Sequence, residues 1–285
     1  MISITPVRMM AFIVGIFIVS AQAYGHGGIY AKLLSLQVSE DISASGLRGD
    51  GDRYRKLSIP WRSECLPVSE NVCAGVWLRG SHMDVKSDMG DQELFHWEAY
   101  GLSAGGDVTI KLSEYFSFRG GVGVGYSRIY NRSHIQDHTE WDNSTLDWKH
   151  KNVRFVSPEM GGIITFGDFS LRPGISFLSI SECSSGLGDI DARTGSYSLR
   201  MAYTFRNAFS LMGQEGHIVV GNNTGGFYGA GHRDDLGFSM VNETQILAAI
   251  PFARNGATTY IHTGPGLLLA DNGAKGMSFT FSLKI

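Results

Sequence analysis

Long stretches of the chain alternate between apolar residues and small or polar ones. In the clearest stretch, the even-numbered positions from Phe116 to Tyr130 are mostly aromatic or aliphatic, and the odd-numbered positions between them are small or polar. Successive side chains of a β-strand point to opposite faces, so this stretch predicts a strand with one apolar and one polar face. The same alternation recurs at 196–205 and 277–285.

The length of these strands favours a membrane-spanning barrel over a β-sandwich. A sandwich strand also alternates, with its apolar face turned inward. Strands that cross a bilayer need about 9–11 residues and carry aromatic residues at the ends of the apolar face, whereas ordinary strands average about 5–6 residues. Because hydrocarbon cannot satisfy backbone N–H and C=O groups, such strands must close into a cylinder. We therefore predict an all-β, transmembrane, antiparallel up-and-down β-barrel.

The alternation predicts twelve strands, with ten as the alternative count. An even number places both ends of the barrel chain on the periplasmic side. The predicted strands cover the ranges 28–38, 53–61, 74–86, 95–110, 115–131, 153–166, 169–181, 195–206, 208–222, 238–253, 257–264 and 275–285.

The connections between these strands alternate in length. Short turns are expected at 112–114, 167–168, 206–207 and 254–257. Longer polar connections are expected near 132–152, 182–194, 223–237 and 265–274. Short periplasmic turns and longer external loops alternate in the same way in outer-membrane barrels.

The first residues have the features of a secretory signal peptide. Arg8 supplies a positive charge, residues 9–19 form a short apolar run, and residues 21–23 (Ala-Gln-Ala) match the small-x-small cleavage pattern. We therefore expect 1–23 to be removed and 24–285 to form the barrel, in the outer membrane of a Gram-negative-type envelope. An uncleaved membrane anchor is the alternative, although the apolar run is short for a membrane span.

Charge and hydropathy exclude two classes of protein. Without Arg8, 23 of the 24 basic residues remain against 27 acidic residues, which gives a formal net charge of −4. This balance gives no reason to expect a nucleic-acid partner, which normally requires a basic patch. No later stretch is long and apolar enough to predict a membrane-spanning helix.

If the apolar faces contact lipid, the opposite faces line the interior of the barrel. Six charged residues lie on those faces, namely Asp107, Arg119, Glu159, Arg172, Arg200 and Glu243. Their mixed charge and the modest number of strands favour an interior filled by salt bridges and hydrogen bonds. A selective pathway in which the arginines attract anions is the alternative.

Glycine occupies the odd-numbered positions 121, 123 and 125 of the strand predicted at 115–131. Glycine allows a strand to coil and bend at a barrel wall, which is the interpretation that we favour. The alternative is that a bulky element, such as an inward loop or an N-terminal segment, lies against that wall.

The three cysteines fit an exported protein. Cys65 and Cys73 lie eight positions apart around a proline, close enough to form a disulfide in an oxidising compartment, and Cys183 would remain unpaired. A metal site is the alternative. No CxxC pair or histidine cluster accompanies these cysteines, so we assign no metal and no cofactor.

Two features are candidate catalytic motifs. Residues 101–105 (Gly-Leu-Ser-Ala-Gly) match the GxSxG nucleophile elbow, but that motif requires a strand-to-helix turn and these residues lie inside a predicted strand. Histidine and acidic residues are frequent at 134–142, and further charged residues lie at 189–193 and 232–235. Such groups could form a general-base or metal site at the barrel rim. Because external loops are usually polar, solvated loops are the simpler interpretation, and we assign no catalytic residue.

One region carries a family resemblance. It reads Gly-Leu-Ser-Ala-Gly-Gly-Asp-Val-Thr-Ile-Lys-Leu-Ser from residue 101 and then Gly-Val-Gly-Val-Gly-Tyr-Ser-Arg from residue 121. It resembles the translocator barrels of autotransporters, in which a small-residue strand ends in Gly-x-Asp and a Gly-rich strand ends in Tyr-Ser-Arg. The matching positions are Gly105, Asp107, Tyr126, Ser127 and Arg128. The resemblance implies a barrel of twelve strands, in agreement with the count from alternation.

The chain departs from that family in two ways. No long passenger region precedes the predicted barrel, so we expect a solitary autotransporter-like barrel. The sequence ends in Ile285 instead of the terminal aromatic residue that outer-membrane barrels commonly use for assembly. Phe279 or Phe281 could serve in its place.

These features predict a non-enzymatic, integral outer-membrane barrel with a structural, surface-interaction or limited transport role. The expected partners are outer-membrane lipid and lipopolysaccharide, the barrel-assembly machinery, and an external ligand at the loops. One alternative is a hydrolase at the barrel rim, either a lipid acyl hydrolase or an omptin-like protease. Another is a narrow solute channel.

Overall fold

The computed structural model describes residues 42–49, 51–90, 93–133, 149–183, 191–211, 213–228, 238–254 and 257–284. Within these ranges no helix is long and apolar enough to cross a membrane. The described strands are β1 (Ile42–Arg48), β2 (Asp52–Arg62), β3 (Leu66–Ser69), β4 (Val72–Gly90), β5 (Glu93–Lys111), β6 (Phe116–Asn131), β7 (His150–Phe166), β8 (Phe169–Glu182), β9 (Asp191–Leu211), β10 (Gln214–Tyr228), β11 (Met240–Arg254), β12 (Ala257–Ala270) and β13 (Lys275–Lys284).

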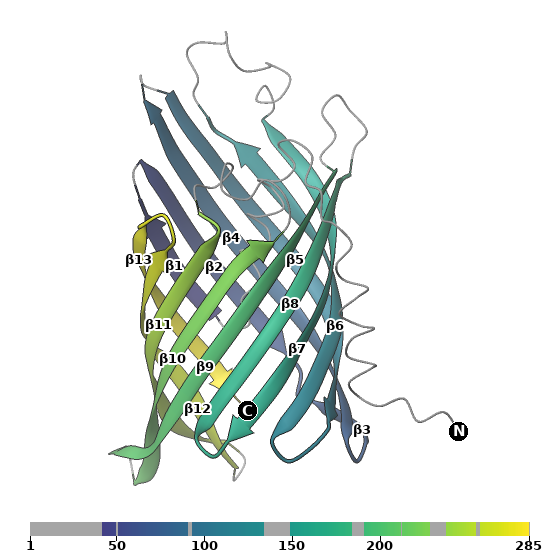
Figure 1. Cartoon of the computed structure of the whole chain (residues 1–285), viewed down its shortest axis with the longest axis vertical. Coiled ribbons are helices and arrows are strands. Elements are labelled where there is room, and N and C mark those ends of the chain that lie inside the picture. Colours follow the sequence, from purple (N-terminus) through teal and green to yellow (C-terminus); the bar gives the residue numbers. More distant parts are fainter. Residues whose placement is uncertain are drawn as a thin grey trace, which may run out of the picture.

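The sheet closes on itself. Each strand from β4 to β13 pairs antiparallel with its sequence neighbour, β1 pairs with both β13 and β2, and β2 pairs with β4. The result is a cylinder of tilted strands, shown in Figure 1. The four-residue strand β3 pairs only with β4 and stands outside the cylinder. The barrel therefore has twelve strands, and the predicted fold class is confirmed.

The two ends of the cylinder differ in their connections. Short turns join β5 to β6 at 112–115 and β7 to β8 at 167–168, and β9 is joined to β10 at the same end. At the opposite end, long connections join β6 to β7, β8 to β9, and β10 to β11. In outer-membrane barrels the short turns are periplasmic and the long connections are external. We call the two ends the turn end and the external end.

Two of the predicted connections are wrong. The turn expected at 206–207 is a β-bulge, because Asn207 has a positive φ of 54° and the register between β9 and β10 shifts beside it. Residues 206–208 oppose His217 alone, and such extra residues bend a strand without ending it, so β9 continues to Leu211. The connection expected at 265–274 is also wrong, since β12 continues to Ala270. The β11–β12 ladder skips Pro265, which has no N–H to donate.

The ends of the predicted strand set also differ from the structure. The first barrel strand is β1, after the range predicted at 28–38, and that range lies outside the described residues. The connection expected to begin at 223 begins later, because β10 extends to Tyr228. In this chain, residues of a connection and residues at the external end of a strand are both polar. The alternation of apolar and polar positions therefore does not show where such a strand begins or ends.

The outer surface of the cylinder carries the apolar faces. On β6, Val122 is 51% exposed and Val124 is 56% exposed, whereas Ser127 on the opposite face is fully buried. Aromatic residues mark both edges of the apolar belt, with Tyr126 toward the external end and Tyr115 stacked on Phe166 at the turn end, their ring centroids 5.4 Å apart. Exposed apolar side chains between two aromatic edges are what a lipid-facing barrel surface requires.

This assignment of faces predicts a large effect of charge on the outer face. Val122→Arg places a guanidinium near the middle of the belt on β6, where the cost to the folding free energy is about 2–4 kcal/mol. Urea unfolding of the protein in phospholipid vesicles measures the loss. Val122→Thr is the control, because it keeps the branched shape and adds no charge. Equal stability of the arginine variant and the wild type would contradict the orientation of β6.

Candidate functional site

The interior of the barrel is where the charged residues converge. Strand register turns all six predicted lumen residues inward: Asp107 on β5, Arg119 on β6, Glu159 on β7, Arg172 on β8, Arg200 on β9 and Glu243 on β11. Five of the six, all except Asp107, line a cavity of about 320 Å³ in the middle of the lumen. This layer of charge is the candidate functional site.

An ionic network connects four strands on one side of the lumen. Arg62 Nη2 on β2 donates to Asp107 Oδ2 over 2.6 Å, and this contact passes across β4. Arg119 Nε lies 3.3 Å from Asp107 Oδ1, and Arg119 Nη2 donates to Glu159 Oε1 over 3.3 Å. Asp107 is buried, so its charge depends on these two guanidinium partners.

A second group of charges faces that network from the other side. Glu243 on β11 accepts a hydrogen bond from Ser278 on β13. Lys56 on β2 interacts electrostatically with Glu243, Arg79 and Arg200. Arg172 and Arg200 occupy directly opposite positions of the β8–β9 ladder. Of these pairs, Glu243 and Ser278 lie on strands that are separated by β12, whereas Arg172 and Arg200 lie on neighbouring strands.

Three basic residues of this layer were missed by the sequence analysis, namely Lys56, Arg62 and Arg79. Counted with the six predicted residues, the layer has six basic and three acidic side chains, a formal net charge of +3. Arg79 was missed because it shares its face of β4 with Trp77, Met83 and Val85. A face with these apolar residues is expected to contact lipid, yet it faces the lumen. The middle of the lumen is therefore cationic, whereas the whole chain is acidic.

Bulky side chains from neighbouring strands cover the glycines of β6. A Cβ at Gly123 would lie 2.5 Å from Trp77 Cη2, and a Cβ at Gly125 would lie 2.7 Å from Phe155 Cε1. The interpretation that we favoured from the sequence, that these glycines serve only to bend the strand, is therefore incomplete. Among the described residues, the bulky groups against this wall are side chains of β4 and β7. The indole of Trp77 also supports Arg79, whose guanidinium carbon lies 4.8 Å from the ring centroid.

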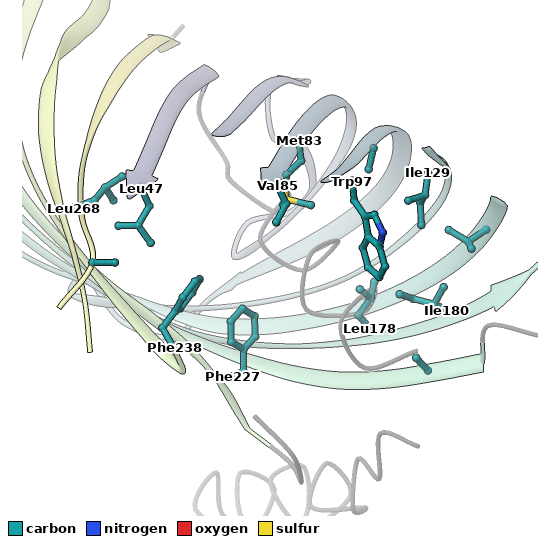
Figure 2. Packing of buried hydrophobic residues seen from close by; sticks show 14 residues of the cluster. Leu47, Met83, Val85, Trp97, Ile129, Leu178, Ile180, Phe227, Phe238 and Leu268 are labelled. Atoms are coloured by element: carbon teal, nitrogen blue, oxygen red, sulfur yellow. The ribbon is translucent and has the colours of Figure 1, made fainter. Parts of the chain in front are cut away.

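The lumen becomes apolar toward the external end. Buried apolar residues project there from nine of the barrel strands and from two connections, and Figure 2 shows them around the inner wall. Some have no exposed surface at all, such as Val153 and Ile180. The layer comprises Leu47, Met83, Val85, Trp97, Ala99, Ile129, Val153, Leu178, Ile180, Ala192, Phe227, Phe238, Leu268 and Ala274. This layer interrupts the predicted polar interior, and an ion pair lies beyond it at the external end, where Lys151 Nζ on β7 is 3.2 Å from Glu182 Oε2 on β8.

One contact crosses the lumen near this apolar layer. The ring of Tyr54 on β2 meets Phe238, just before β11, edge to face with centroids 5.3 Å apart. Because β2 and β11 are separated in the sheet by three strands, this contact spans a chord of the cylinder. An open water channel of constant width is incompatible with it. Tyr228 of β10, in contrast, lies over Gly195 on the outer face of the wall, and its Oη donates across β9 to the backbone oxygen of Ser176 on β8 over 3.3 Å.

Comparison with solved structures identifies the architecture. No protein-family model and no curated protein matches the sequence. The translocator domain of the autotransporter NalP from Neisseria meningitidis matches with a TM-score of 0.53 at 10% identity, over 84% of this chain and 83% of that one. The transport unit of the autotransporter AIDA-I from Escherichia coli matches with a TM-score of 0.53 at 11% identity, over 92% of this chain and 99% of that one.

A third match agrees with these two. The β domain of the Bordetella autotransporter BrkA has a TM-score of 0.50 at 10% identity and covers 84% of this chain and 96% of its own. The chain has the fold of an autotransporter translocator barrel. The resemblance to autotransporter translocator barrels is confirmed at the level of the fold. Identities of this size carry no further information about activity.

The candidate catalytic motifs gain no support from the described residues. Ser103 of the GxSxG stretch is buried on the inner face of β5 and is followed by more strand, so no nucleophile elbow forms. The polar stretch at 134–142 and residues 232–235 lie outside the described residues, as do 189–190, whereas Arg193 is exposed on β9. Within the described ranges, no cluster of three or more His, Cys, Asp or Glu residues could hold a metal ion.

The cysteines lie at both ends of the barrel, with Cys65 and Cys73 at the turn end and Cys183 at the external end. Cys65 and Cys73 form a disulfide with a Cα–Cα distance of 5.5 Å, which joins the segment before β3 to β4. Cys183 is free and exposed just after β8. The disulfide therefore ties the segment before β3, a strand that stands outside the cylinder, to β4 of the barrel wall.

The packing of Trp77 over glycine predicts a coupled pair of substitutions. Gly123→Leu alone should destabilise the barrel by about 1–3 kcal/mol, because the new side chain overlaps the indole. In a Trp77→Ala background the same substitution should cost less, since the space is vacant. Urea unfolding of the four proteins in vesicles gives the coupling energy.

Gly120→Ala is the control for this cycle. Gly120 lies on the outer face of β6, where an added Cβ meets only ordinary contact with Phe118 at 3.6 Å. Additive effects of the Gly123 and Trp77 substitutions would show that the indole does not lie over this glycine.

Proposed function

We propose that this chain is an integral outer-membrane barrel whose lumen is closed at rest, with a structural or surface-interaction role and no catalytic activity. The observation that carries the proposal is the buried apolar layer at the external end of the lumen. A wall that lines an open aqueous channel would expose its side chains to water, whereas these are buried. The charged layer, which lies nearer the turn end, then stabilises the barrel from inside by linking its strands.

The ionic network supports a closed interior. Asp107, Arg119 and Glu159 are largely inaccessible and satisfy one another at 3.3 Å, which is the arrangement expected when charges must be kept from water in a narrow barrel. Cross-strand pairs of this kind tie β2, β5, β6 and β7 together inside the wall. They stabilise one arrangement of the barrel and leave few groups free to conduct ions.

The cellular setting of the proposal follows from the fold and the sequence. The signal peptide at 1–23, the lipid and lipopolysaccharide environment and insertion by the barrel-assembly machinery remain predictions. The long connections of the external end would face the surroundings of the cell, where an external ligand would bind. The barrel would serve to hold these connections at the surface.

A narrow anion channel is the second candidate. The favouring observation is the net charge of +3 in the middle of the lumen, beside a cavity of about 320 Å³. Basic rings in a pore attract anions. This activity would require the apolar layer to move aside, so it would be gated.

Single-channel recording separates the two candidates. The purified, folded protein in a planar bilayer should give no regular conductance steps, because the apolar layer keeps the lumen dry. Replacing Phe227 and Phe238 by alanine removes two large rings of that layer, and the variant should conduct with anion selectivity, measured as the reversal potential in a salt gradient. Val124→Ala on the lipid face is the matched control and should stay silent.

Folding of each variant is checked by heat-modifiable migration on a gel. Regular steps from the wild-type protein would contradict the closed lumen and favour the channel. Silence of a correctly folded double-alanine variant would show that other parts of the chain close the lumen.

A further inference from the structure

The outer surface of the barrel carries a row of four basic residues at the external end. Lys275 of β13 is paired with Arg48 of β1, Arg48 is paired with Arg53 of β2, and Arg53 is paired with Lys86 of β4. Each is directly opposite the next in the antiparallel ladders. We call these four residues the cationic row.

The cationic row faces away from the lumen. The strand neighbours of its members, such as Leu47, Tyr54 and Val85, belong to or pack on the buried apolar layer inside the barrel. Arg48, Arg53 and Lys275 are exposed and Lys86 is half-buried. Long basic side chains on this face can extend along the surface toward the edge of the bilayer.

The apolar belt begins immediately beside the row. Two positions from Lys275 toward the turn end, Met277 is 64% exposed, and on β2 the apolar outward residues begin at Leu57. Arg55 lies between Leu57 and the row on the same face of β2. The strands that carry the row are tilted in the wall of the cylinder (Figure 1). Basic residues that adjoin the edge of an apolar belt are placed to reach lipid headgroups.

Like charges directly opposite one another in a ladder repel, and this row contains three such pairs in succession. Asp84 of β4 and Glu98 of β5, which lie on the outer face beside the row, are engaged elsewhere. Asp84 lies 3.6 Å from His96, and Glu98 contacts His82 at 3.1 Å and Arg132 at 2.8 Å. Among the described residues, the four positive charges of the row therefore have no ion-pair partner.

The opposite flank of the same register row is neutral. The row continues from Lys275 through Leu269 of β12 to Asn242 of β11 and Thr224 of β10. Asn242 Nδ2 donates to Thr224 Oγ1 over 2.7 Å, so the polar groups there satisfy each other. Within this register row, directly opposed basic residues therefore occur from β13 to β4 and not on β12, β11 and β10.

We propose that the cationic row and Arg55 form a binding site for the phosphate groups of a membrane lipid on the outer face of β13, β1, β2 and β4. Guanidinium groups bind phosphate oxygens in pairs, and several bound phosphates would remove the repulsion between the basic residues. Acyl chains of the same lipid would lie on Met277, Phe279 and Leu57. The combination of phosphate and acyl chains selects a multiply phosphorylated lipid over a free anion. This inference rests on the proposed outer-membrane location.

The test measures binding of lipid A with two phosphates to the full-length protein in zwitterionic detergent micelles. Binding is followed by the shift in the temperature at which heat-modifiable migration is lost. The variant Arg48→Gln, Arg53→Gln, Lys275→Gln should bind about tenfold more weakly or worse, since each basic residue near an anionic lipid contributes to the affinity. Dephosphorylated lipid A and inorganic phosphate should each leave the wild-type protein unshifted.

A matched control removes the same charge from other strands of the outer face. Arg128, Arg154 and Arg193 are exposed at the external end of β6, β7 and β9. Their replacement by glutamine should leave lipid A binding within a factor of about two, because loss of distant surface charge acts only through a screened field. An equal loss in both triple variants would overturn the assignment, as would a shift of the wild type by inorganic phosphate alone.

A second readout does not depend on the lipid. In lipid-free micelles the glutamine variant of the row should be at least as stable as the wild type, because the repulsion is gone. If this variant is instead less stable without lipid, the row is a structural element and the proposal fails. If the unheated wild-type protein gives no folded band, the barrel itself is contradicted. If the wild type folds normally but shows no preference for phosphorylated lipid A, only the lipid site is contradicted.

Discussion

The structure depends on one constraint, the satisfaction of every backbone N–H and C=O group without help from water. Within hydrocarbon a sheet achieves this only when its first and last strands pair, as β1 and β13 do here. Closure fixes the rest of the arrangement. Each strand must present alternate residues to lipid and to the interior, so Val122 and Val124 are exposed on the outside while Ser127 is buried on the inside.

The interior then has to be filled from the inward-facing residues alone. The chain does so in layers, with charges around Asp107 and Arg119 in the middle and apolar side chains such as Ile129 and Val153 toward the external end. Where an aromatic ring needs space against the wall, as Trp77 does, the neighbouring strand supplies a glycine. The outer surface also differs from one side to the other at the external end. Basic residues lie in a row from β13 to β4, and neutral polar residues occupy the same register row on β10 and β11.

Much of the fold was predictable because period-two alternation is a direct consequence of facing two different media. The strand count, the closed sheet and the inward direction of Asp107 and Arg119 follow from that pattern. The limits of strands were less predictable, since Asn207 in a bulge and Pro265 in a continuous strand give the same local signal as a turn. Arg79 was missed because inward aromatic packing breaks the rule that apolar residues face lipid. Which residues meet across the lumen depends on strands far apart in the sequence.

The most direct test of the account is a spin-label scan of residues 196–201 on β9, in a Cys183→Ser background. Electron paramagnetic resonance in vesicles compares the accessibility of each label to oxygen, which concentrates in lipid, and to a polar nickel reagent. The account predicts high oxygen accessibility at 197, 199 and 201, and low values at 196, 198 and 200, where side chains line the cavity. A profile without this alternation, or with the opposite phase, would contradict it.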